Sequence, residues 1–190
     1  MEKRKSMCVI VDKDYYNLKD ILACRQILKC LFPAPLGEEV FNLIGQREPE
    51  MEDGICYADL PLFMVKSLPN RKVLPPVQFG KMQMEILRAS PEHVDIMRLN
   101  QFYYIVARHL ARLLTGERAQ FLAETVLYTF LQRSGWIIKF AIFEGPKSKK
   151  LDCMEAELYD KALKSSTQFS EWFFSKQALA RKKLAIQKWQ

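Results

Sequence analysis

The sequence predicts a mainly α protein in which a helical domain follows a small β-rich N-terminal domain. Long segments with apolar residues at three- and four-residue spacing occupy the chain from residue 77 onward. The earlier part contains only short β-prone runs and is interrupted by Pro33 and Pro35. An acidic, polar stretch at residues 46–54 separates the two parts and has the composition of a linker. We therefore predict a small β-containing domain at residues 1–55 and an α-helical domain at residues 56–190.

The N-terminal part holds two strand candidates and one helix candidate. Residues 8–11 and 40–44 are compact apolar runs of the length typical of strands. Asn17 begins a segment that resembles a capping box, with Asp20 in the place of the usual Glu, and so predicts a short helix toward Cys24 or Lys29. A module of 55 residues buries little surface by itself, so we expect it to pack against the rest of the chain.

Residues 58–79 lie between the short, acidic segments of the N-terminal part and the long helical patterns that follow. Asp59 has the side chain of an N-cap, and Pro61 suits the first turn of a helix. The residues that follow these signals supply an apolar stripe, made by Leu60, Phe63, Met64 and Leu68. This pattern predicts a short amphipathic helix that docks one domain on the other.

Helical patterns occupy residues 77–89 and 99–114, with a break at residues 90–92 and Gly116 in the position of a C′ residue. The next pattern, residues 117–143, is apolar over most of its circumference. Its polar positions form one narrow line, comprising Glu117, Gln120, Glu124, Tyr128, Gln132, Gly135 and Lys139. A helix of this kind is enclosed by other structure, either the core of this chain or another subunit.

The last part of the chain begins with a loop at residues 145–150. Asp152 then caps a helix, with Glu155 three residues later. We expect the apolar face of this helix to continue to Phe173, with a break near residues 164–166. The basic segment up to Gln190 is either a final helix or a frayed tail.

Composition indicates a soluble, intracellular protein. The longest apolar run is far shorter than the ~20 residues that a membrane span needs. The five cysteines include no CxxC pair, which argues against a disulfide scaffold and against a structural zinc site. We therefore expect reduced thiols in a cytosolic or nuclear protein.

Catalytic patterns are not found in the sequence. There are two histidines, and His109 lies between Arg108 and Arg112, where a surface imidazole is the expected role. The phosphate-binding patterns GxxxxGK[ST] and GxGxxG and the nucleophile pattern GxSxG do not occur. We expect no enzyme and predict no catalytic, cofactor-binding or metal-binding residue.

Charge is distributed unevenly along the chain. Residues 1–60 contain 8 basic and 11 acidic residues, whereas the remaining 130 residues contain 21 and 11, a net charge of +10. Lysines of this region could neutralise phosphates, and aromatic residues such as Trp172 and Phe173 could stack on bases. A basic helical adaptor that binds DNA or RNA directly is therefore an alternative function.

Four segments resemble subunit 3 of the GINS complex, the Psf-three family. Residues 58–63, ADLPLF, resemble its acidic-Leu/Ile-Pro-Leu-Trp motif, with Phe63 where Trp is commoner. Residues 16–22 resemble its early Asp-Ile-Leu segment, and residues 94–103 resemble the approach to its central helix. Residues 151–172 resemble its final helical region. These matches occur in the family's order and span most of residues 15–177.

The resemblance implies a non-catalytic scaffold that acts in DNA replication in the nucleus. Its partners would be three other GINS subunits, which form a heterotetramer, together with the MCM ring and the RecJ-like activator protein of the CMG helicase. Contact with DNA would be indirect, and no membrane and no cofactor would be involved. Large apolar residues are our candidates for subunit or ring contacts, namely Phe63, Phe102, Tyr103, Phe121, Phe130, Trp136, Phe143 and Trp172.

Overall fold

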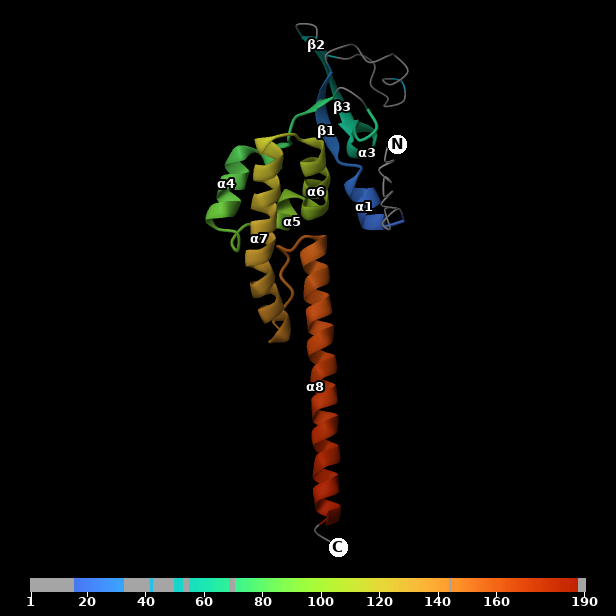
Figure 1. The fold of residues 1–190 in the computed structure, drawn as a ribbon, viewed down its shortest axis with the longest axis vertical. Coiled ribbons are helices and arrows are strands. Elements are labelled where there is room, and N and C mark those ends of the chain that lie inside the picture. Colours follow the sequence, from blue (N-terminus) through green and yellow to red (C-terminus); the bar gives the residue numbers. More distant parts are fainter. Residues whose placement is uncertain are drawn as a thin grey trace, which may run out of the picture.

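The computed structural model describes residues 16–32, 42, 50–52, 55–68, 71–143 and 145–187. A small antiparallel sheet lies at one end of the molecule, packed helices form its middle, and one long helix projects at the other end (Figure 1). The prediction of a mainly α fold with a small β-containing N-terminal part is confirmed.

Within the described residues, the sheet contains four strands in the order β2-β3-β1-β4. They are β1 (Ile27–Phe32), β2 (Glu50–Glu52), β3 (Ile55–Pro61) and β4 (Lys72–Val73). Strand β1 buries every second residue, Leu28, Cys30 and Phe32, which is the alternation of a strand with one face on the core. Strand β1 was not predicted from the sequence, and β2 lies within the stretch predicted to be a linker. The strands that it did predict, at residues 8–11 and 40–44, lie outside the described residues except for residue 42.

The helix that we predicted to begin at Asp59 is wrong in its first turn. Residues up to Pro61 are extended and pair with β1, so that Asp59 lies opposite Lys29 and Leu60 opposite Leu28. The helix α3 (Leu62–Val65) begins only after this strand, and no side chain caps it. Ladder hydrogen bonds to β1 therefore outweigh the local capping signal. The sheet consequently contains residues from both sides of position 55.

The described N-terminal helix follows the sequence closely. In α1 (Leu18–Ala23), the Asn17 side chain accepts a hydrogen bond of 3.0 Å from the backbone N–H of Lys19. Asp20, the presumed partner in a capping box, instead contacts Arg108 and His109. Its carboxylate thus joins α1 to the helical region.

The other helices in the described ranges are η1 (Val77–Phe79), α4 (Lys81–Ala89), α5 (Ile96–Leu99), α6 (Tyr103–Leu113), α7 (Glu117–Ile142) and α8 (Cys153–Gln187). The break predicted at residues 90–92 is confirmed. The helix predicted at 99–114 is divided, because Asn100 is extended between α5 and α6. Gly116 directly precedes α7 with φ +65°, a conformation that favours glycine.

One hydrophobic core joins the sheet to the helices. It includes Leu28 and Leu60 from the sheet, Leu62 from α3, Leu87 from α4 and Leu110 from α6. The N-terminal part therefore packs against the helical part, as its small size predicts. A second, smaller cluster of Ile137, Ala141, Leu151 and Tyr159 joins α7 to α8.

Helices α7 and α8 run parallel, since the segment after α7 returns along it before α8 begins (Figure 1). Asp152 caps α8 as predicted, because its Oδ1 accepts from the N–H groups of Met154 and Glu155 at 2.9 and 2.8 Å. The break predicted near residues 164–166 is wrong, because α8 is continuous through Gln187. Its C-terminal half extends beyond the end of α7 with no other described element beside it (Figure 1).

Candidate interaction surface

Among the described residues, the side chains of Asp20, Cys24 and His109 form a cluster that resembles a metal-binding site. One ligand atom from each lies within 4.8 Å of the others. However, Lys66 Nζ lies 3.2 Å from Cys24 Sγ, and Arg108 Nη2 lies 2.9 Å from Asp20 Oδ1. Two cationic groups on the ligand atoms oppose the binding of a divalent cation. The cluster is better suited to holding α1 against α6.

The prediction that His109 lies at the surface is wrong. His109 is buried, and its Nε2 lies 2.7 Å from Asp20 Oδ1. Burial lowers the pKa of His109, and the charges of Lys66 and Arg108 lower it further, against the opposing effect of Asp20. The imidazole is therefore neutral at pH 7 and donates its Nε2 proton to the carboxylate. Its role is structural.

A buried ion pair fixes α7 relative to α8. Arg133 is 1% exposed and Glu155 is 0% exposed, and the two form hydrogen bonds of 2.6 and 2.9 Å. Arg133 also donates to the carbonyls of Pro91 and Val94, and the Tyr104 hydroxyl donates to Glu155 at 2.7 Å. Each charge is thus satisfied by several partners, as a buried pair requires. These bonds leave neither side chain available for chemistry.

The exposed side of α7 carries an apolar stripe. Leu127, Leu131, Ile138 and Ile142 are all solvent-exposed, and their spacing places them on one side of the helix. The residues that α7 buries in this chain include polar ones, Thr125, Thr129 and Arg133. An ordinary surface helix turns its apolar side inward, whereas α7 buries Leu122, Ile137 and Ala141 together with these polar residues and also leaves an apolar stripe in solvent. An exposed apolar stripe on a helix marks a surface for another molecule.

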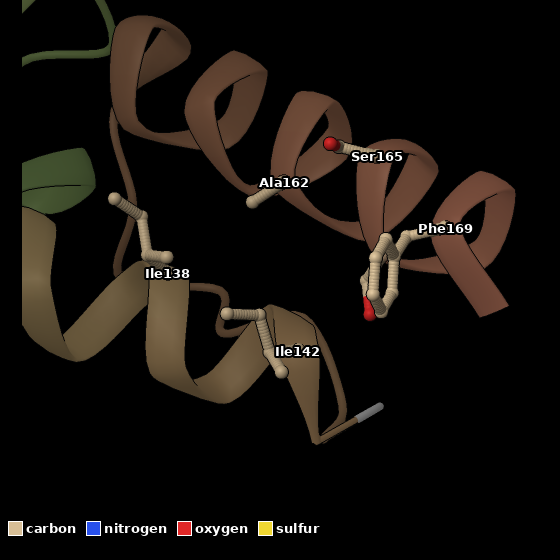
Figure 2. A pocket seen from close by; sticks show the side chains of 6 residues that line it. Ile138, Ile142, Ala162, Ser165 and Phe169 are labelled. Carbon is tan, nitrogen blue, oxygen red and sulfur yellow. The ribbon is translucent and has the colours of Figure 1, made fainter. Parts of the chain in front are cut away.

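An open groove of about 370 Å³ continues the stripe between α7 and α8. Ile138 and Ile142 line one wall, and Ala162, Ser165, Ser166 and Phe169 line the other. Figure 2 shows the two isoleucines pointing from α7 toward the α8 residues. Among the described residues, the lining includes no charged side chain, and its side-chain polar groups are the two serine hydroxyls.

Aromatic side chains extend the same surface along α8 beyond the end of α7. Phe169 stacks on Phe173 at 6.1 Å between ring centroids and lies 5.8 Å from Trp172. Trp172 is 50% exposed, and Phe174 is also exposed on this part of α8. We call the set of Leu127, Leu131, Ile138, Ile142, Phe169, Trp172 and Phe173 the α7–α8 apolar surface.

The eight predicted contact residues are not gathered in one place. Trp172 belongs to the α7–α8 apolar surface, and Phe143 is 73% exposed just after α7. Phe63 is also exposed, on α3 beside the sheet. Tyr103 is fully buried in this chain's core, and Phe102, Phe121 and Phe130 pack against that core. Trp136 packs on the second cluster.

Of the α7–α8 apolar surface, Trp172 alone was among the contact residues predicted from the sequence, because the predicted set consists of aromatic residues and so omits the four aliphatic residues of α7. Leu127, Leu131, Ile138 and Ile142 share a side of the helix on a helical wheel, so the stripe itself was visible in the sequence. Its exposure was not visible, because it depends on which side of α7 the rest of the chain covers. The polar line that we predicted from Glu117 to Lys139 is solvent-exposed, as expected.

Within the described ranges, no helix has both the length and the hydropathy that crossing a membrane requires. Comparison with known protein families finds no family that matches the chain, and comparison with curated proteins finds no matching relative.

Proposed function

We propose that this chain is a non-catalytic scaffold subunit of the GINS heterotetramer. In this role it joins three other GINS subunits and, with them, links the MCM ring to the RecJ-like activator in the CMG helicase. It acts in the initiation of DNA replication and in fork progression, in the nucleus.

The observation that supports a scaffold role most directly is the α7–α8 apolar surface. Stable protein interfaces have an apolar centre enriched in aromatic residues, and this surface combines leucine, isoleucine, phenylalanine and tryptophan on adjacent helices. The part of α8 beyond α7 carries Trp172 and Phe173 into solvent. A helix without tertiary packing is only marginally stable in water, so this segment gains stability from a partner.

The polar clusters of the chain are consistent with the same role. Arg133, Glu155 and Tyr104 saturate one another, and Asp20, His109 and Arg108 join α1 to α6. Both clusters hold elements together and neither lines the groove. The resemblance of residues 58–63, 94–103 and 151–172 to the Psf-three family supplies the identity of the assembly.

Co-expression with the three other GINS subunits tests this proposal. We expect the four chains to elute together in size-exclusion chromatography. We also expect Leu131→Glu to abolish co-elution, because it places a charge in the centre of the apolar stripe. Gln132→Glu is the matched control, since it adds the same charge at an exposed position off the stripe, and it should co-elute normally.

Two results would contradict the proposal. Failure of the wild-type chain to co-elute with the other subunits, while it remains folded and monodisperse alone, would exclude the GINS role. Normal co-elution of the Leu131→Glu chain would exclude the stripe as the interface.

Direct binding of nucleic acid is the second candidate, and the basic end of the chain favours it. Residues 161–187 contain six basic residues and one acidic residue, a net charge of +5. A gel-shift titration of the isolated chain at several salt concentrations separates the two functions. Tight binding that falls steeply with salt, with the slope of several phosphate contacts, would favour the adaptor.

A further inference from the structure

We infer that the groove between α7 and α8 receives an amphipathic helix whose apolar residues are flanked by acidic side chains. This inference rests on the proposed scaffold function and specifies the chemistry of the partner segment that binds there.

The shape of the groove fits a helix. Its α7 wall is formed by Ile138 and Ile142, which are one turn apart. Its α8 wall follows the spacing i, i+3, i+4 and i+7, in the order Ala162, Ser165, Ser166 and Phe169. Two helices that lie side by side with this spacing leave a groove into which the ridge of a third helix packs. The small side chains of Ala162 and the two serines allow the third backbone to approach closely.

Other classes of ligand fit the groove less well. A small polar molecule is oriented by several convergent polar groups, and the described residues of this groove offer two serine hydroxyls. A nucleic acid places phosphates on basic side chains, and no described basic side chain lines the groove. Because the groove is open to solvent, it can receive side chains from a long helix that lies across it.

The groove continues into the aromatic part of α8. Phe169 lines the groove and stacks on Phe173, and Trp172 lies beside Phe169. A helix that places one apolar residue in the groove can therefore contact Trp172 and Phe173 with residues one and two turns away. The continuous surface favours a partner helix of several turns over a short extended peptide.

Exposed lysines on α7 and α8 indicate that the partner helix carries acidic residues beside its apolar face. Lys176 is exposed on α8 and forms no ion pair within the part of the chain that the structure describes. Lys176 Nζ lies 4.6 Å from the centroid of the Trp172 ring, at the edge of the aromatic surface. Lys139 is exposed on α7 near the groove. Acidic side chains along the partner helix would complement these cations. Residues 161–187 of α8 carry a net charge of +5, so the α8 helices of two copies would repel each other.

Two synthetic helical peptides of about four heptads provide the probe. Both carry the same Leu and Trp seam, and they differ only in having Glu or Lys at every flanking position. We expect the full chain to bind the Glu peptide at least about tenfold more tightly than the Lys peptide, as measured by fluorescence anisotropy. This preference should shrink as salt rises from about 50 to 500 mM, because salt screens exposed charges.

Two substitutions on α8 test whether the peptide binds in the groove. Ser165→Glu adds a charge inside the groove, and Thr167→Glu adds the same charge at an exposed position on another side of the helix. We expect Ser165→Glu to weaken binding of the Glu peptide by about tenfold or more and Thr167→Glu to change it by less than about threefold. Both residues are exposed, so far-UV circular dichroism should show that both variants remain folded.

The outcomes separate this inference from the proposed function. Equal binding of the two peptides, tighter binding of the Lys peptide, or equal effects of the two substitutions would overturn the inference. So would self-association of the full chain that Ser165→Glu abolishes, because the occupant would then be a second copy. Co-elution of the other GINS subunits with the Ser165→Glu chain would also overturn it, while leaving the scaffold role intact. Selective binding of the Glu peptide by a chain that recruits no GINS subunit would support the groove and exclude the scaffold role.

Discussion

Two adjacent tyrosines on α6 differ in what their hydroxyl groups contact. The Tyr104 hydroxyl donates to Glu155 at 2.7 Å, whereas the Tyr103 hydroxyl is buried without a hydrogen-bond partner among the described residues. Tyr103 is held in place by its ring, which stacks on Phe79 at 4.8 Å between centroids. The two phenols therefore contribute differently to stability although they are neighbours in sequence.

Replacing each tyrosine by phenylalanine tests this difference. Tyr103→Phe removes an unsatisfied polar group, so we expect the free energy of unfolding to stay the same or to rise by about 1 kcal/mol. Tyr104→Phe removes a donor from a buried carboxylate, so we expect a loss of about 1–3 kcal/mol. Urea denaturation of the two variants measures both values. Equal losses would show that the Tyr103 hydroxyl has a partner in solution.

Asp152 gives the molecule a specific pH dependence. Burial raises the pKa of this carboxyl from 3.8 to about 6, and the charge of Glu155 acts in the same direction against the hydrogen bonds from the backbone. The folded state therefore binds the proton more tightly than the unfolded state does. The resulting contribution to stability is complete below a pH of about 4 and is lost as the pH rises through about 6.

Asp152→Asn removes this titration while keeping an oxygen that can accept from Met154 and Glu155. We expect the stability of the wild-type chain relative to the variant to fall by about 1–3 kcal/mol between a pH of about 4 and a pH of about 7. A constant offset between the two proteins, caused by the lost contact of Oδ2 with the Tyr104 N–H, does not affect this slope. Parallel stability curves over this range would show that Asp152 has an ordinary pKa.

At the scale of elements, α1, β3 and α8 show which parts of the fold the sequence can predict. The start of α1 at Asn17 and the cap of α8 at Asp152 were predicted, because such caps depend on residues a few positions apart. Strand β3 was not, because its extended backbone depends on pairing with β1, about 30 residues away. His109 was misplaced for the same reason, since its burial depends on Asp20 of α1. Local signals predict element ends, and distant contacts decide element type and exposure.

The aromatic part of α8 should matter for binding and not for the stability of the isolated chain. Trp172 and Phe173 are exposed, so we expect the double variant Trp172→Gln/Phe173→Gln to change the free energy of unfolding by less than about 0.5 kcal/mol. The same variant should weaken assembly with the other GINS subunits. Leu110→Ala, in the core of α6, is the contrasting variant and should cost about 2–5 kcal/mol. Strong destabilisation by the double variant would show that these aromatics pack within this chain.

At the scale of the whole molecule, the shared core couples the sheet to the helices. Leu28 and Leu60 of the sheet belong to the same cluster as Leu110 of α6, and Lys19 of α1 forms an ion pair of 2.7 Å with Glu157 of α8. A division at residue 55 would predict two independent units. The shared core predicts one cooperative unit over the described residues.

Thiol labelling during denaturation distinguishes these two possibilities. Cys30 and Cys56 are fully buried in the sheet, so their reaction with a thiol reagent reports on its opening. We expect them to become reactive at the same urea concentration at which far-UV circular dichroism reports loss of the helices. Labelling that precedes the loss of helix would show that the sheet unfolds separately and would restore the division at residue 55.

The pair of Arg133 and Glu155 also has a mechanical consequence. It lies near the start of α8, and Lys176 lies 21 residues farther along the helix, which is about 30 Å at 1.5 Å per residue. A tilt of α8 by about 5° at the ion pair therefore moves the aromatic end by roughly 3 Å. The buried ion pair, together with the second core cluster that joins α7 to α8, therefore helps to set the position of whatever binds at the far end of α8.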